Sequence, residues 1–161
     1  MSRPGWIGQV SRALLLAALG AGSAAHADDG ARRKVAPLLP KYQQECASCH
    51  VAYPPGMLPA ASWRRLLGNL PHHFGVDASL DAPTVDELAA WLGAHAGTDR
   101  RSREAPPEDR ITRSARFIRE HDEVPPAVWK RPAVKSAANC AACHTRADQG
   151  DFDEHAVRIP R

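Results

Sequence analysis

Apolar side chains recur every three to four residues in two long stretches, the spacing that places them on one face of an α-helix. The first stretch predicts a helix over residues 60–70 that ends near Pro71. Its apolar face consists of Trp63, Leu66, Leu67 and Leu70. The second predicts a helix over residues 84–96, because Thr84 to Glu87 has the pattern of a capping box and Gly97 that of a C-cap. Its apolar face consists of Val85, Leu88, Trp91, Leu92 and His95.

Shorter helices are predicted along the rest of the chain. They cover residues 38–47, residues 112–121 and the segment leading into Cys140. Turns and loops are predicted at 51–59 and 98–109, an extended proline-containing segment at 125–132, and a mostly polar tail from Thr145. No strand-type alternation stands out. We therefore predict a mostly α fold, a small single domain of short helices and long proline-rich loops that is not a tandem repeat.

Composition limits the size of the hydrophobic core. The chain has 161 residues, which predicts one domain and excludes a large multidomain enzyme. Hydrophobic residues make up 43%, but aromatic residues only 6%, and there are 14 prolines. So few large rings give a thin core unless something other than side chains fills it.

The first 27 residues have the pattern of a cleaved signal peptide. Arg3 and Arg12 are positive, the run from Ala13 to Leu19 is apolar, and Ala25-His26-Ala27 provides a small-x-small cleavage site. An uncleaved N-terminal anchor is the alternative, but the apolar run is far shorter than the roughly 20 residues of a membrane-spanning helix. The mature domain is therefore predicted to comprise residues 28–161, located in the periplasm and not inserted in the membrane.

The charge pattern does not suggest a nucleic-acid partner. The formal charge is +3 and falls to +1 without residues 1–27, because that segment holds two arginines and no acid. The basic clusters at 32–34 and 100–103 are short and have acidic residues nearby. A solvated surface is the simpler interpretation of both clusters.

Two copies of the C-x-x-C-H pattern carry the chemistry. They are the first motif, Cys46 to His50, and the second motif, Cys140 to His144. Cysteines three residues apart on one turn can form thioether bonds to the two vinyl groups of a haem, and the next histidine faces the iron. The motifs use all four cysteines. Two disulfides or a zinc site are the alternatives, but neither requires a histidine directly after each cysteine pair. Two c-type haems are therefore predicted.

The second axial ligand of each iron decides between electron transfer and catalysis. The candidates in the mature chain are Met57, His72, His73, His95, His121 and His155. One methionine cannot serve two irons, so two histidines at each iron is the simplest interpretation. His73 and His121 are the favoured ligands, since His73 precedes Phe74 and His121 shares a helix face with Phe117. The residues leave open which of the two serves which haem, and whether another histidine replaces one of them.

At the level of motifs the sequence resembles the soluble dihaem cytochromes c called DHC. The residues that carry the resemblance are the two motifs, Tyr53-Pro54-Pro55, Ser62-Trp63, His73-Phe74-Gly75, Arg119-Glu120-His121 and Gly150-Asp151-Phe152. The resemblance implies a mostly helical periplasmic electron carrier with two low-spin, bis-histidine haems. It also implies two partners, a small high-spin monohaem cytochrome c and a membrane b-type cytochrome, and it supports His73 and His121 as ligands.

Electron transfer is thus the predicted function, with no enzymatic activity of its own. The alternative is a small dihaem enzyme, a peroxidase or a gas-binding protein, with one open or exchangeable iron site. Such an enzyme needs a vacant sixth position and acid–base groups above it. The excess of histidines makes a vacancy the weaker hypothesis.

Overall fold

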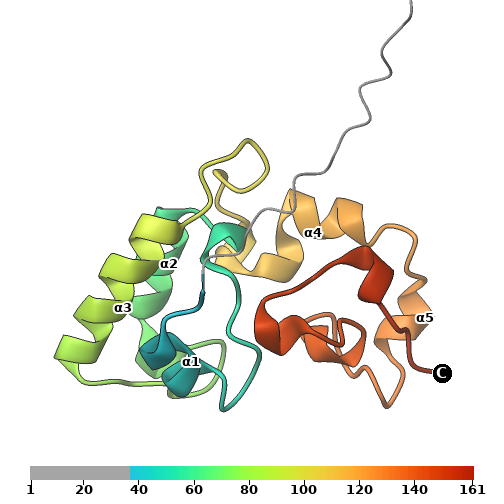
Figure 1. The fold of residues 1–161 in the computed structure, drawn as a ribbon, viewed down its shortest axis with the longest axis horizontal. Coiled ribbons are helices and arrows are strands. Elements are labelled where there is room, and N and C mark those ends of the chain that lie inside the picture. Colours follow the sequence, from blue (N-terminus) through green and yellow to red (C-terminus); the bar gives the residue numbers. More distant parts are fainter. Residues whose placement is uncertain (1–36) are drawn as a thin grey trace, which may run out of the picture. The chain divides into compact units, whose positions relative to one another are not determined.

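Short helices provide the regular structure of residues 37–161, the part of the chain that this computed structural model describes (Figure 1). The α-helices are α1 (Pro40–Cys46), α2 (Ala60–Leu67), α3 (Ala82–His95), α4 (Ala115–Glu120) and α5 (Pro126–Trp129). Within these residues the only β-type pairing is two isolated bridges, His73 with Val76 and His144 with Val157. The mostly α fold expected from the sequence is confirmed. The predicted signal peptide, residues 1–27, lies outside the described residues.

Single turns of 3-10 helix fill much of the space between the α-helices. They are η1 (Pro55–Met57), η2 (Leu70–His72), η3 (Pro107–Asp109), η4 (Ile111–Arg113), η5 (Cys140–Ala142), η6 (Ala147–Gln149) and η7 (Glu154–Ala156). Proline occupies one of the first two positions of η1, η2 and η3, and also of α1, α3 and α5. Proline suits a helix start because the amide hydrogen that it lacks has no partner there. The prolines therefore begin many short helices.

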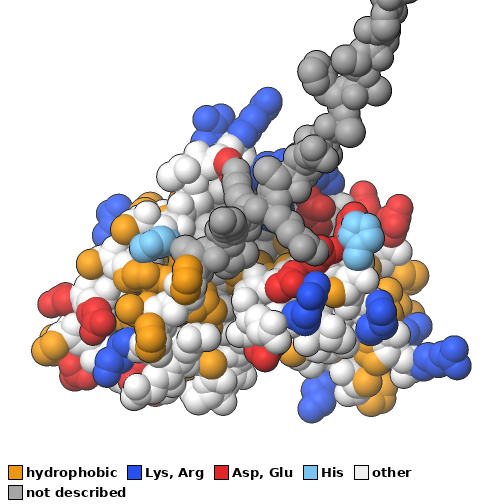
Figure 2. All heavy atoms as spheres, in the orientation of Figure 1, with side chains coloured by type: hydrophobic (Ala, Val, Ile, Leu, Met, Phe, Trp, Pro, Cys, Tyr) orange, Lys and Arg blue, Asp and Glu red, His pale blue; other side chains and the backbone are white. Residues whose placement is uncertain are grey.

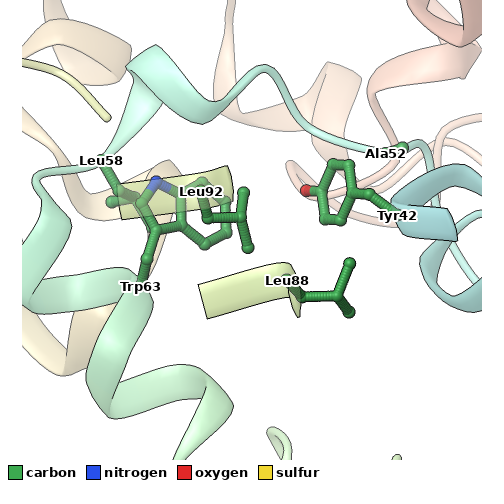
Figure 3. Close-up of a cluster of buried hydrophobic side chains, with 6 residues drawn as sticks. All are labelled: Tyr42, Ala52, Leu58, Trp63, Leu88 and Leu92. Atoms are coloured by element: carbon green, nitrogen blue, oxygen red, sulfur yellow. The ribbon is translucent and has the colours of Figure 1, made fainter. Parts of the chain in front are cut away.

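The main hydrophobic cluster lies between α1, α2 and α3 (Figure 3). Its buried members are Tyr42, Ala52, Leu58, Trp63, Leu88 and Leu92. Leu88 and Leu92 are only 0% and 1% exposed, as expected for the apolar face of α3. The polar atoms of the aromatic rings are also satisfied, because the Trp63 indole donates to the Pro55 carbonyl at 2.7 Å and the Tyr42 hydroxyl to the Tyr53 carbonyl at 3.0 Å.

The α3 helix begins two residues earlier than the sequence pattern predicted. Asp81 is the N-cap, and its carboxylate accepts hydrogen bonds from the Thr84 amide at 3.0 Å and from the Thr84 hydroxyl at 2.8 Å. Thr84 is thus the third residue of the helix rather than its cap. The prediction was wrong because Asp81-Ala82-Pro83 is an equally good start, with the acceptor at the cap and proline inside the first turn.

Other predicted helices differ at their ends. The α2 helix ends at Leu67 rather than near Pro71, because the chain turns at Gly68 and continues into η2. The α4 helix begins at Ala115, where the Ser114 hydroxyl caps it by accepting from the Phe117 amide at 3.0 Å. Each of these helices is shorter than the periodicity alone suggested.

Two further predictions in the C-terminal part were wrong. The segment expected to be extended contains α5, because Pro126 supplies a helix start. The helix expected before Cys140 is replaced by turns, with a single 3-10 turn at Cys140–Ala142. Buried hydrophobic residues are scarce in this part of the chain and consist of Val128, Val134 and Ala147. The thin core anticipated from the composition is therefore found after residue 97.

Charged side chains of both signs are interspersed on the face shown in Figure 2. None of the helices within residues 37–161 has the length and apolar character needed to cross a membrane.

Gly97 occupies a position with no room for a side chain. A Cβ atom there would collide with the side chain of Ser102 and would lie 2.7 Å from the Gly56 carbonyl oxygen. We expect Gly97→Ala to lower the free energy of unfolding by about 1–3 kcal/mol, the usual cost of overpacking, measured by denaturant unfolding of the holoprotein.

Gly93 provides the matched control, since it lies within α3 and a Cβ atom there has nothing within 4 Å. Gly93→Ala should raise the free energy of unfolding by about 0.5–1 kcal/mol, because alanine favours a helix more than glycine does. Equal effects of the two substitutions would contradict this account of Gly97.

Candidate functional site

The two C-x-x-C-H motifs occupy different local structures. Cys46 is the last residue of α1, and the first motif continues through a turn to His50. The second motif begins with η5, and its last residue is linked to its first, because the His144 amide donates to the Cys140 carbonyl at 2.8 Å. None of the four cysteines forms a disulfide within residues 37–161.

The first histidine pair consists of His50 and His73. Their ring centroids are 6.2 Å apart, and the ring planes differ by 28°. The short η2 turn after α2 brings His73 to this position, and the bridge between His73 and Val76 follows it. Phe74 and Gly75 form this tight turn with positive φ angles of 51° and 101°. The unusual backbone at Phe74 is thus part of the turn that presents the His73 ring.

The second histidine pair consists of His121 and His144. Their ring centroids are 6.0 Å apart, and the ring planes differ by 70°. His121 directly follows α4 and caps its C-terminus. Each motif histidine therefore faces one of the two histidines that the sequence favoured as second ligands. The two members of each pair are also close in sequence, 23 residues apart in both cases.

Hydrogen bonds orient one ring in each pair. The Nδ1–H group of His50 donates to the Val51 carbonyl at 2.7 Å, and that of His121 donates to the Phe117 carbonyl at 2.9 Å. With the proton on Nδ1, the Nε2 lone pair is free to bind a metal. The Nδ1 atoms of the other two rings, His73 and His144, are buried and have no hydrogen-bond partner.

The electrostatic environment favours neutral imidazoles. Burial lowers the pKa of His73, and the neighbouring His50 ring lowers it further. Burial and the neighbouring His121 ring lower the pKa of His144 in the same way. The neutral form is the one that binds a metal ion.

Burial raises the pKa of three of the four thiols. Together with the charges of Glu45 and Cys49, it raises the pKa of Cys46 to about 11. Burial is also the largest cause of the raised pKa values of Cys140 and Cys143. Within residues 37–161 no three or more His, Cys, Asp and Glu side chains are grouped to hold a metal ion alone.

An aromatic ring contacts each of the four paired histidines. The contacts are Tyr53 on His50 at 4.8 Å, Phe74 on His73 at 4.9 Å, Phe117 on His121 at 4.1 Å and Phe152 on His144 at 5.3 Å between centroids. Trp129 lies 5.8 Å from His121 as well. These rings restrict the rotation of the imidazoles and surround them with apolar surface.

The remaining candidate histidines are used elsewhere. His72 is exposed and lies 3.2 Å from the Asn69 side-chain oxygen. His95 is exposed and donates to the Trp91 carbonyl at 2.8 Å, which a helix end explains. His155 has an 86% exposed side chain and pairs with Asp153 at 2.9 Å. No contact brings these three rings, or Met57, to His50 or His144.

The residues present fit a haem between the rings of each pair. An imidazole nitrogen binds a metal at about 2 Å, so one ion held in line by two rings of about 1.1 Å radius separates their centroids by about 6 Å. Both pairs have this separation.

Sequence reasoning missed the role of Tyr53. Its ring stacks on His50, and its hydroxyl donates to the Ala138 carbonyl at 3.2 Å, 85 residues away. The position three residues after His50 could have indicated the stacking. No local pattern could have indicated the contact with Ala138, because it depends on how distant segments meet.

The C-terminal tail, which the sequence predicted to be mostly polar, forms backbone contacts with the second motif. Val157 pairs with His144, and the Arg158 amide donates to the Cys143 carbonyl at 2.8 Å. The Arg131 guanidinium donates to the Pro160 carbonyl at 2.6 Å. The tail therefore positions His144 from the side of the chain that follows it.

Ending the chain after Ala156 should therefore weaken the second motif. We expect the free energy of unfolding to fall by about 2–3 kcal/mol, because one neutral and one charge-assisted hydrogen bond are lost. Denaturant unfolding of the holoprotein measures this. Removal of Arg161 alone is the control and should change little, so an equal loss in both variants would contradict the proposed role of the tail.

Comparison with known proteins adds independent information. Residues 42–152 match the family model described as dihaem cytochrome c, DHC. The structure is similar to a dihaem cytochrome c from Shewanella baltica OS155, with 41% identity over 75% of this chain and 92% of that chain and a TM-score of 0.67. It is also similar to DHC from Rhodobacter sphaeroides, with 43% identity over 71% of this chain and 96% of that chain and a TM-score of 0.62. A search of curated proteins gave no match.

Proposed function

The chain belongs to the dihaem cytochrome c family, and from this premise we propose that it is a periplasmic electron carrier whose two haems are each ligated by two histidines. The family accounts for two c-type haems, one at each C-x-x-C-H motif. When bound, a haem supplies one-electron chemistry at its iron.

The proposed ligands are His50 with His73 for one haem and His144 with His121 for the other. The observation that carries this proposal is the distance within the pairs, 6.2 Å and 6.0 Å between ring centroids. We call these the first centre and the second centre. The assignment also chooses between the two distal histidines, which the sequence left open.

The chain's own groups would hold the ligands in a fixed state. The carbonyls of Val51 and Phe117 accept the Nδ1 protons of His50 and His121, which fixes the tautomer of each ring. The aromatic neighbours restrict the ring planes. Little reorganisation of the ligands is then expected when the charge on the iron changes.

Electron transfer is favoured over catalysis because both axial positions have a histidine. An enzyme would need an open position for its substrate, and His73 and His121 would occupy it at both centres. Two imidazoles also lack the potential-raising effect of a methionine sulfur. We therefore propose potentials below those of histidine–methionine cytochromes.

The leader pattern supports a proposed location, and the family resemblance supports two proposed partners. The signal-peptide pattern of residues 1–27 supports export to the periplasm. We propose that electrons pass from a membrane b-type cytochrome through this protein to a small high-spin monohaem cytochrome c.

Carbon monoxide distinguishes the carrier from a dihaem enzyme. The reduced holoprotein should show no rapid change in its visible spectrum when carbon monoxide is added, because neither iron has an open position. Rapid formation of a carbon monoxide adduct at one haem would instead favour the alternative, a peroxidase or gas-binding protein.

A further inference from the structure

Tyr53 contacts the axial histidine of the first motif. Its ring lies 4.8 Å from the His50 ring between centroids, and the planes differ by only 21°. The stacking covers one face of the imidazole and limits its rotation. The orientation of His50 therefore depends on where the Tyr53 ring is held.

The hydroxyl of Tyr53 is held by the backbone just before the second motif. It donates to the Ala138 carbonyl at 3.2 Å, two residues before Cys140. One side chain thus contacts the histidine of the first motif and the segment that leads into the second motif.

The backbone of Tyr53 is fixed from a third direction. Its carbonyl accepts the hydroxyl of Tyr42, which is 2% exposed within the main hydrophobic cluster. The rings of Trp63 and Trp91 pack on Tyr42 at 6.5 Å and 5.4 Å between centroids. Tyr53 is therefore attached to the main hydrophobic cluster as well as to His50 and to the segment before the second motif.

Other contacts also join residues before position 97 to residues after it, but they do not involve the paired histidines. Arg65 forms a two-point ion pair with Asp109 at 2.6 Å and 2.8 Å. The Arg110 guanidinium lies 4.2 Å from the centroid of Phe74, the residue after His73. These contacts hold the chain near the first centre without reaching the His50 ring or the second motif.

We propose that Tyr53 is a positioning residue that couples the two haem centres, fixing the plane of the His50 imidazole against the second motif. The inference rests on the proposed histidine ligation. It means that the ligand geometry of the first centre depends on the structure around Cys140. A disturbance of the second motif is transmitted to the first iron through this side chain.

Tyr53→Phe tests the coupling because it removes the hydroxyl and keeps the ring. The holoprotein is studied by hydrogen exchange and by electron paramagnetic resonance of the ferric form. The resonance signals of the two centres can be distinguished, because the angle between the two imidazole planes is 28° at the first centre and 70° at the second. Phe152→Leu is the matched control, because Phe152 contacts the motif histidine of the second centre.

We expect two changes in Tyr53→Phe. The amides of Cys143 and His144, which donate to the Cys140 carbonyl, should exchange about fivefold faster, the effect of losing one hydrogen bond. The g-values of the first centre should shift while those of the second stay in place. Phe152→Leu should show the reverse pattern in the resonance.

The proposal is overturned if Tyr53→Phe leaves the amide exchange of residues 143–144 unchanged, or if the g-values of the first centre do not move. The Ile118 amide of α4 donates to the Ser114 carbonyl and is the internal reference. It should exchange at the same rate in the wild-type protein and in Tyr53→Phe. A wild-type spectrum without two low-spin bis-histidine signals would contradict the proposed ligation. Amide exchange would still show whether Tyr53 holds the second motif, so the two failures are distinguishable.

Discussion

Replacing His73 with alanine should convert one haem of the two to the high-spin form, and replacing His121 should do the same to the other haem. Each substitution removes one ring of a pair and leaves the opposite pair intact. An iron that loses its sixth strong ligand becomes high-spin and open to small molecules. The visible spectrum of the oxidised protein and carbon monoxide binding to the reduced protein measure both effects.

Two exposed histidines are the controls for this prediction. His72→Ala removes the immediate neighbour of His73. His95→Ala removes the ring that donates a hydrogen bond to the Trp91 carbonyl. Both variants should keep two low-spin haems. If His73→Ala and His121→Ala also stay fully low-spin, the ligand assignment is wrong.

Replacing both Cys140 and Cys143 with alanine should remove one haem and the ordered structure of the C-terminal part. The buried hydrophobic side chains there are Val128, Val134 and Ala147, too few to form a core of their own. The haem is expected to supply the apolar volume between His121 and His144. We expect one haem per chain and loss of protection from amide exchange across residues 115–150.

The equivalent change in the first motif is the matched comparison. With Cys46 and Cys49 replaced, the side chains of the main hydrophobic cluster can still pack on one another; they include Tyr42, Trp63, Leu88 and Leu92. The α2 and α3 helices should therefore keep more protection than α4 and α5 do in the other variant. Equal protection in the two variants would contradict a haem-dependent core in the C-terminal part.

The fold was predictable where local pattern decides the structure. The core positions of α2 and α3 were correctly predicted, because Trp63, Leu88 and Leu92 follow the helical period and are buried. Two other members of the predicted faces differ, since His95 is exposed and Leu70 lies in η2. Helix ends were less predictable, since Thr84 and Asp81 both satisfy the capping preference and only the folded chain selects Asp81. The α5 helix was missed because four residues give too little periodicity.

The candidate site was predictable as a set of residues but not as an arrangement. The C-x-x-C-H spacing and Met57, the single methionine left after removal of residues 1–27, pointed to four histidines. The pairing of His73 with His50 and of His121 with His144 required the structure, because it depends on the η2 and α4 positions. The links through Tyr53 and through the C-terminal tail join residues far apart in sequence, so no local pattern signals them.

In the proposed holoprotein, four histidines bind two irons in two separate pairs. The most direct measurement is the visible and near-infrared spectrum of the oxidised and reduced holoprotein, combined with a pyridine haemochrome count. We expect two haems per chain, both low-spin, with no sulfur-to-iron charge-transfer band. A single haem, a high-spin fraction in the wild-type protein or a sulfur-to-iron band would contradict it.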